Sequence, residues 1–157
     1  MAYRRHHKWP QFAAGRTNSG TLNFIIDYAV SFLERVGSGW EENELSVSHE
    51  HFATECMVAF LSEKWRQMNA RKDGPIVLIT ALPGDPYNLG ILMCAIVTSM
   101  TRLKVVYLGI DTPIDEIIRI AKSSFPKLIA LSISHSMSTE FTEDFLFKIR
   151  GDVNEKS

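Results

Sequence analysis

The sequence predicts an α/β protein in which a helical front segment precedes a parallel β-sheet. Two observations lead to this prediction. In the back half, three apolar runs rich in β-branched residues, at 76–80, 103–108 and 128–133, alternate with helical patterns. The front half has helical periodicity and no strand pattern. Strands that alternate with helices imply right-handed crossovers and therefore a parallel sheet.

Composition places the chain among ordinary globular proteins. Its 157 residues are 45% hydrophobic and 22% charged, with a net charge of -1, which suits one domain with a small helical addition. A balanced charge gives no electrostatic basis for nucleic-acid binding, and we expect the basic residues at 4–8 to belong to a solvated tail. Without a recognisable signal peptide or a bilayer-spanning apolar run, the expected location is the cytoplasm, with no membrane contact.

The chain is expected to divide into three parts. Residues 1–20 lack periodicity and are predicted to form an irregular tail. Residues 21–70 are predicted to form a helical cap, and residues 75–157 an α/β domain. The polar stretch between the last two parts ends in Asp-Gly, which is a turn signal.

Two helices are expected in the cap. Thr21 is a plausible N-cap for the first, which would run to about Val36 and end at Gly37 and Gly39. Ser46 or Ser48 would cap the second, which would run to about residue 68. Its inward face would carry four apolar positions, Phe52, Cys56, Phe60 and Leu61 or Trp65. We expect Cys56 and Cys94, the two cysteines, to be buried reduced thiols.

The α/β part begins with a buried strand that leads into a loop containing glycine and proline. A loop at the carboxyl end of a first parallel strand is where open α/β sheets bind ligands, so residues 82–90 are the first candidate site. Gly84 and Gly90 lie in it, either to let a ligand approach the backbone closely or to satisfy the geometry of a tight turn. A helix nearly apolar all round follows at 89–99.

The remaining units repeat this plan. Pro113 suits the first turn of a helix that runs to about residue 124, and Thr139 is expected to cap a last helix that runs to about Arg150. The third strand, at 128–133, is apolar and uncharged, and no fourth strand follows it in this chain. Its outer edge is therefore expected to be open, which predicts a homodimer through this edge or marginal stability.

These residues together resemble a known family, the cobalamin-binding modules. Trp40, nine intervening residues, and then Glu50 and His51 are followed by the loop Gly-Asp-Pro-Tyr-Asn-Leu-Gly at 84–90. The pattern is most similar to the helical cap and flavodoxin-like domain of light-responsive, adenosylcobalamin-dependent MerR-type transcriptional regulators. Similar back halves occur in methionine synthase and in the corrinoid proteins of methyltransferases. The resemblance implies a flavodoxin-like sheet, here truncated after three β-α units.

The resemblance also implies roles for individual residues. Gly84, Asp85 and Gly90 would form the cleft for the corrinoid tail between strands one and three. Ser132 would hydrogen-bond the nucleotide base, although a strand-ending hydroxyl can equally satisfy local backbone.

On the cap, the resemblance places Trp40 against the upper ligand of the corrin and His51 as an upper-face cobalt ligand. Glu50 would orient the helix or meet the periphery of the cofactor. On spacing alone, an ordinary core tryptophan and a surface Glu-His pair explain the same residues.

One position departs from the family pattern. The family carries Asp-x-His-x-x-Gly, in which the histidine ligates cobalt from below, and this chain has Tyr87 at the histidine position. A phenol is a poor cobalt ligand near neutral pH because it keeps its proton. The lower protein ligand is therefore expected to be missing.

The sequence thus predicts a cobalamin-binding or cobalamin-derived sensory domain, which is not an enzyme and which signals to a regulatory partner protein. No Ser/His/Asp, Cys/His or paired-carboxylate pattern supports catalysis. Three alternatives stay open. One is a cofactor-free interaction domain in which Tyr87 fills the cleft. The others are a haem sensor with His51 as a ligand, and a corrinoid carrier for a methyltransferase.

Overall fold

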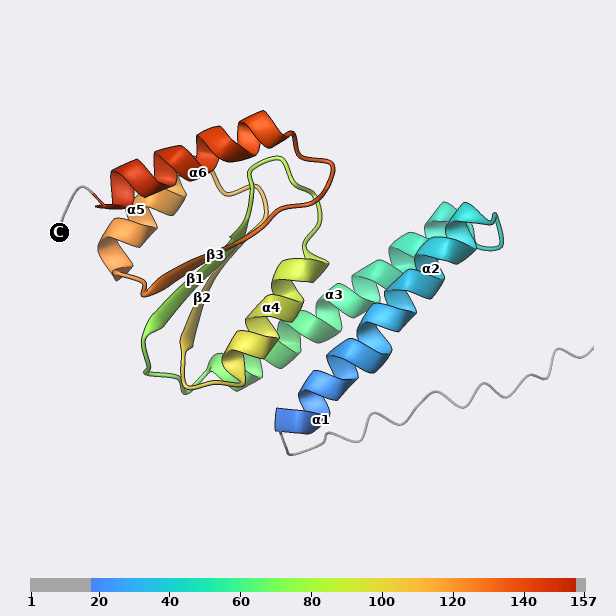
Figure 1. The fold of residues 1–157 in the computed structure, drawn as a ribbon. Coiled ribbons are helices and arrows are strands. Elements are labelled where there is room, and N and C mark those ends of the chain that lie inside the picture. Colours follow the sequence, from blue (N-terminus) through green and yellow to red (C-terminus); the bar gives the residue numbers. More distant parts are fainter. Residues whose placement is uncertain (1–17, 155–157) are drawn as a thin grey trace, which may run out of the picture.

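The computed structural model describes residues 18–154, and these form a helical cap joined to a three-layered α/β unit (Figure 1). One long helical rod begins the cap. It comprises α1 (Asn18–Asn23), a π-helical stretch η1 (Phe24–Val30) and α2 (Ser31–Glu41). A short turn then reverses the chain into α3 (Val47–Asn69). The two arms of this hairpin lie side by side in Figure 1.

The first cap helix differs from the sequence prediction at both ends. Thr21 lies inside α1 instead of at its start, and α2 continues through Gly37 and Gly39 to Glu41. A Cβ atom on Gly39 would lie 3.0 Å from Cδ1 of Leu45, so this glycine admits the packing of the turn against the helix. That contact offsets the roughly 1 kcal/mol that glycine costs in a helix interior.

The second cap helix begins as predicted, but part of its inward face was predicted wrongly. The Ser46 hydroxyl accepts a hydrogen bond from the backbone N–H of His49 at 3.4 Å, which is the N-cap arrangement. Leu61 is fully buried. Phe52, in contrast, is 72% exposed, and both Cys56 and Cys94 are exposed free thiols. The predicted burial of these three side chains is therefore wrong.

The sheet has three parallel strands in the order β2-β1-β3. These are β1 (Ile76–Ala81), β2 (Lys104–Gly109) and β3 (Leu128–Ser132). Each predicted strand is present to within one residue at either end. The order matches the first three strands of the flavodoxin-like order 2-1-3-4-5. The predicted α/β fold class and parallel sheet are confirmed.

Helices cover both faces of β1, which explains why it is an unbroken apolar run. On one face, Val77, Ile79 and Ala81 pack against α4 (Leu89–Ser99). On the other, Leu78 and Leu82 pack against α5 (Ile114–Ser124) and α6 (Thr139–Asn154). Figure 1 shows α5 and α6 on one side of the sheet, and α4 with the cap on the other.

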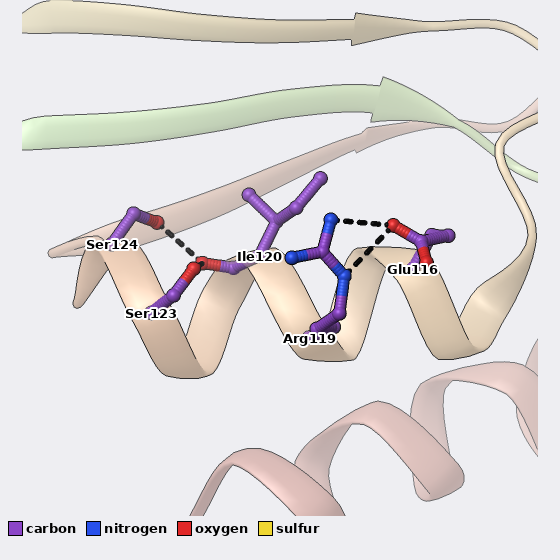
Figure 2. Close-up of polar contacts among 5 residues, drawn as sticks. All are labelled: Glu116, Arg119, Ile120, Ser123 and Ser124. Atoms are coloured by element: carbon purple, nitrogen blue, oxygen red, sulfur yellow. Dashed lines mark hydrogen bonds and ion pairs between the residues drawn. The ribbon is translucent and has the colours of Figure 1, made fainter.

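Local hydrogen bonds shape α5. The Glu116 carboxylate accepts two hydrogen bonds from the Arg119 guanidinium, at 2.7 and 3.0 Å, which lowers the pKa of this exposed carboxyl (Figure 2). At the other end, the hydroxyls of Ser123 and Ser124 both donate to the carbonyl of Ile120. The helix then ends as Phe125 adopts a left-handed conformation.

The last helix differs from its predicted limits at both ends. The hydroxyl of Ser138, and not that of Thr139, caps it by accepting from the N–H of Phe141 at 3.2 Å. The helix continues past Arg150 to Asn154, so that Gly151 is helical. Phe145 and Ile149 form its buried stripe.

The cap is fixed to the α/β unit through α4. Ile25 and Leu61 from the cap share a buried cluster with Leu92 and Ile96. Trp65 extends this contact to β2, where its ring lies 5.2 Å from that of Tyr107, and burial raises the pKa of Tyr107 to about 12. Among residues 18–154, no helix is both long enough and apolar enough to cross a membrane.

Candidate functional site

The candidate site lies where the three parallel strands end. The loops after β1, β2 and β3 meet at this edge, as expected for an open α/β sheet. In Figure 1 the turn between α2 and α3 lies toward the same end of the molecule as the loop after β1. The predicted site residues therefore fall into a base group on these loops and a cap group on α2 and α3.

Asp85 is the residue that ties the base group together. Its side chain is fully buried, and one carboxylate oxygen accepts from the N–H of Tyr87 at 3.1 Å. The other accepts from the N–H of Ser134 at 2.7 Å, in the segment that follows β3. Two charge-assisted hydrogen bonds satisfy a carboxylate that burial would otherwise destabilise. Asp85 thus fixes the loop after β1 to the loop after β3.

A second contact joins the β1 loop to the β2 loop. The N–H of Gly84 donates to the carboxylate of Asp111 at 3.3 Å. Gly84 has a φ of +82°, which a residue with a Cβ adopts only with strain, and no atom lies within 4 Å of where its Cβ would be. Gly84 is therefore required by the turn and also leaves open space beside it.

Gly90 and Ser132 lie directly beside each other at the start of α4. A Cβ on Gly90 would be 3.4 Å from the Ser132 hydroxyl oxygen. Asn88, at the N-cap position of α4, makes no side-chain capping bond. The start of α4 thus presents a bare backbone, a neighbouring hydroxyl, and first-turn N–H groups without a capping side chain, which is a suitable environment for an anionic or polar ligand group.

Tyr87 does not fill a cleft in this structure. Its side chain is 58% exposed, and its contribution to the loop is the backbone hydrogen bond to Asp85. The phenol is consequently free to face either solvent or a ligand.

The cap group is held much less tightly. Trp40, in the last turn of α2, is 49% exposed. His51 is exposed as well, and its Nε2 lies 3.4 Å from the carboxylate of Glu50. Glu50 also accepts a hydrogen bond from the Thr54 hydroxyl at 2.8 Å. Both contacts stay within α3, where Glu50 can orient the imidazole of His51.

The described residues contain no group of three or more His, Cys, Asp or Glu side chains that could hold a bare metal ion. A metal at this site would need a cofactor that supplies most of its ligands. His51 is exposed enough to add one axial nitrogen to such a metal.

Sequence reasoning missed two contributors to the base. Asp111 lies in the loop after the second strand, and no role was predicted for its carboxylate. Ser134 contributes only its backbone N–H, which no side-chain pattern could reveal. The position of Asp111 directly after a strand, in a Gly-Ile-Asp-Thr-Pro loop, was the one available signal.

Comparison with known proteins gives two findings. A family model described as a B12 binding domain matches residues 13–63. A solved structure, a novel cobalamin-binding protein from Desulfitobacterium hafniense DCB-2, is 24% identical, with a TM-score of 0.42. That match covers 78% of this chain, and the chain spans 59% of the length of the matched structure. A comparison with curated proteins found no match. Residues 13–63 of this chain, which include most of the described helical cap, therefore match the B12 binding domain family.

Proposed function

We propose that this chain binds a cobalamin between the helical cap and the loops at the carboxyl ends of the strands. The observation that carries the proposal is the juxtaposition of Gly90 and Ser132 at the edge between β1 and β3. It occurs in a chain whose helical segment matches a B12 binding domain. A glycine has no side chain to keep a ligand away from the backbone, and the neighbouring hydroxyl can form a hydrogen bond with that ligand. Both properties suit the nucleotide tail of a cobalamin.

In this proposal the base group receives the tail. The Ser132 hydroxyl would hydrogen-bond the nucleotide base, and Gly84 and Gly90 would let the tail pass close to the backbone. The start of α4 favours a phosphate, because its N–H groups carry partial positive charge and have no side-chain cap. Asp85 does not touch the cofactor but holds two of the loops in place.

The cap group would cover the other side of the corrin ring. Trp40 has the exposed aromatic surface to pack against an upper ligand. His51 supplies an imidazole that cobalt binds well, and Glu50 orients it. When bound, the cofactor would supply a cobalt ion with an exchangeable upper ligand. The identity of that upper ligand is the signal that the domain would sense.

The proposed role is sensory or regulatory and not catalytic, with the state of the cofactor passed to a partner protein. Tyr87 supports this choice over a methyl-group carrier, because carriers of the family that the sequence resembles use a histidine below cobalt. The exposure of Tyr87 also favours a cofactor-binding domain over one whose cleft is filled by this side chain. No observation favours haem.

Reconstitution tests the proposal. The full chain is incubated with hydroxocobalamin, adenosylcobalamin or haemin, passed through a desalting column, and examined by visible absorption. We expect corrin bands to co-elute with the protein and haem bands not to do so. Protein that elutes colourless after every incubation would contradict cobalamin binding.

The lower face of the cofactor can be tested separately. With Tyr87 below the ring, we expect no protein imidazole to ligate cobalt from that side. Electron paramagnetic resonance of the cob(II) form, prepared from His51→Ala protein labelled with nitrogen-15 histidine, reports the lower nitrogen without a contribution from the proposed upper-face ligand. Splitting that changes with the label would show a protein histidine there. Splitting that stays unchanged supports the assignment.

A further inference from the structure

The pairing of β1 with β2 is irregular close to the candidate site. The register shifts after Ile79, and Thr80 lies opposite Gly109. Leu108 is therefore left without an opposite residue in β1. An extra residue of this kind is a β-bulge, which bends its strand and re-aims the segment that follows. Here that segment is the loop 109–113, which belongs to the base of the candidate site.

Thr80 contacts this bulge with its side chain. Its hydroxyl lies 3.1 Å from the carbonyl oxygen of Gly109 and 3.2 Å from that of Ala81. The side chain is fully buried, so a hydroxyl without an acceptor would be unfavourable here. The four residues before it in β1, Ile-Val-Leu-Ile, are all apolar. The one hydroxyl of this strand thus lies where the neighbouring strand becomes irregular.

The loop 109–113 has an unusual backbone and is closed by a hydrogen bond. Gly109 has a φ of +83°, and Asp111 has a φ of +55°. Such values are uncommon for a residue with a Cβ and persist where the surrounding structure holds them. The Thr112 hydroxyl donates to the carbonyl of Leu108 at 3.0 Å, which closes the loop on the bulge.

The contact that this loop makes with the β1 loop depends on where its backbone lies. The carboxylate of Asp111 accepts from the N–H of Gly84 at 3.3 Å. Asp111 is exposed, so burial does not hold its side chain in place. The position of the loop backbone therefore decides whether the carboxylate and the N–H meet.

We propose that Thr80 is a positioning residue of the candidate site, and that its hydroxyl sets the loop 109–113 so that Asp111 reaches Gly84. Thr80 is fully buried and acts through the carbonyl of Gly109. A loop that is already in place costs less entropy to order when a ligand binds. This effect on binding rests on the proposed function, whereas the position of the loop does not.

The inference can be tested in the cofactor-free chain with three variants and a control. Thr80→Val keeps the shape of the side chain without the hydroxyl, Thr80→Ser keeps the hydroxyl, and Asp111→Ala removes the acceptor. Thr142→Val is the matched control, because it removes a hydroxyl that donates to the carbonyl of Ser138 at 2.9 Å in α6. The measurement is the amide proton resonance of Gly84 in nuclear magnetic resonance spectra, and circular dichroism confirms that each variant is folded.

We expect the Gly84 resonance to move in Asp111→Ala and to move in the same direction in Thr80→Val. It should stay near its parent position in Thr80→Ser and in Thr142→Val. Combining Thr80→Val with Asp111→Ala should add no further shift, because the contact is already lost. A Gly84 resonance that responds to Asp111→Ala but not to Thr80→Val would overturn the inference. A resonance that does not respond to Asp111→Ala would overturn it as well.

A second measurement needs no variant and therefore holds even if Thr80→Val does not fold. In the parent protein, the proton of the buried Thr80 hydroxyl should exchange slowly with water and show nuclear Overhauser contacts with Gly109. A hydroxyl proton without contacts to Gly109 would show that Thr80 does not hold the bulge, and the inference would fail.

Titration with hydroxocobalamin separates this inference from the proposed function. We expect Thr80→Val to bind about threefold more weakly than the parent chain, and Thr80→Ser to bind as the parent does. A parent chain that binds no cobalamin would contradict the proposed function, while the Gly84 resonance would still decide the position of the loop. Equal affinity in the parent and in a Thr80→Val variant with a displaced Gly84 resonance would overturn the role of Thr80 in binding.

Discussion

The two halves of the candidate site are built differently. In the base half, the buried carboxylate of Asp85 joins two loops, and Asp111 joins a third to them. In the cap half, Trp40 and His51 are exposed, and the contacts of Glu50 stay within one helix. The base is therefore part of the folded structure before any ligand arrives. The cap presents side chains whose positions a ligand would determine.

This difference indicates how a cofactor-dependent signal could arise. Cross-linked loops give a rigid surface, and a rigid surface lowers the entropic cost of binding. Exposed side chains such as Trp40 and His51 can adopt different conformations when a ligand binds or when the bound ligand changes its chemical state. We therefore expect substitutions of the residues that join the base loops to change both stability and cobalamin affinity, and substitutions of exposed cap residues to change cobalamin affinity alone.

The largest effect is expected for Asp85→Ala. The substitution leaves the backbone N–H groups of Tyr87 and Ser134 without their acceptor and releases the β1 loop from the β3 loop. We expect the free energy of unfolding to fall by about 3 kcal/mol and cobalamin binding to be lost. Urea denaturation and reconstitution measure the two.

The matched control is Asp115→Ala, which removes an exposed aspartate that forms an ion pair with the exposed Lys148 at 3.0 Å. Surface ion pairs of this kind contribute about 0–1 kcal/mol. If Asp85→Ala were no more destabilising than Asp115→Ala, the base would not be held by Asp85 and the contrast between the halves would fail.

A smaller effect, in the opposite direction, is expected for Tyr87→His. An exposed side chain is replaced, so stability should change little. An imidazole below cobalt should tighten cobalamin binding about tenfold, a change of about 1.4 kcal/mol. Titration followed by visible absorption gives the affinity, with Tyr87→Phe as the control. Equal or weaker binding by a folded Tyr87→His variant would count against the proposed alignment of this loop with the cofactor.

The parts of this structure that the sequence predicted are those with strong local patterns. The strands at β1, β2 and β3 and the helix α4 combine continuous apolar runs with nearby glycine or proline, and each was placed to within one residue. Ser46 caps α3 because a hydroxyl directly before a helix accepts a local N–H. These features depend on neighbours in the sequence.

The parts that the sequence did not predict depend on residues far apart. Asp85 binds Ser134 across 49 positions, and Asn69 binds Val105 across 36. The helix α2 passes through Gly37 and Gly39, where glycine was predicted to end it, and the side chain of Leu45 packs against the second of them. Phe52 fits the apolar spacing of α3 but lies on a part of the helix that no other element buries in this structure. Periodicity identifies a helix face but not its partner.

A cap variant tests the other side of the comparison. Trp40→Ala removes a half-exposed side chain, so the free energy of unfolding should change by no more than about 0.5 kcal/mol. Affinity for cobalamin should fall about fivefold, because an aromatic surface over the upper ligand is lost. Phe147→Ala, at an exposed position on α6, is the control. A large loss of stability in Trp40→Ala would show that the cap half is as firmly built as the base.

The smallest expected effect comes from Gly90→Ala, and it separates binding from stability within the base itself. Alanine favours a helix over glycine, so the free energy of unfolding should rise by about 0.5 kcal/mol. The new methyl group would lie 3.4 Å from the Ser132 oxygen, in the space proposed for the cofactor tail, and affinity should fall about threefold. Gly151→Ala is the matched control, because it makes the same change in α6 at a position where no atom lies within 4 Å of the added Cβ. It should leave cobalamin affinity unchanged. If Gly90→Ala bound cobalamin as well as the parent chain, the tail would not pass between Gly90 and Ser132, and the base would hold its loops for some other purpose.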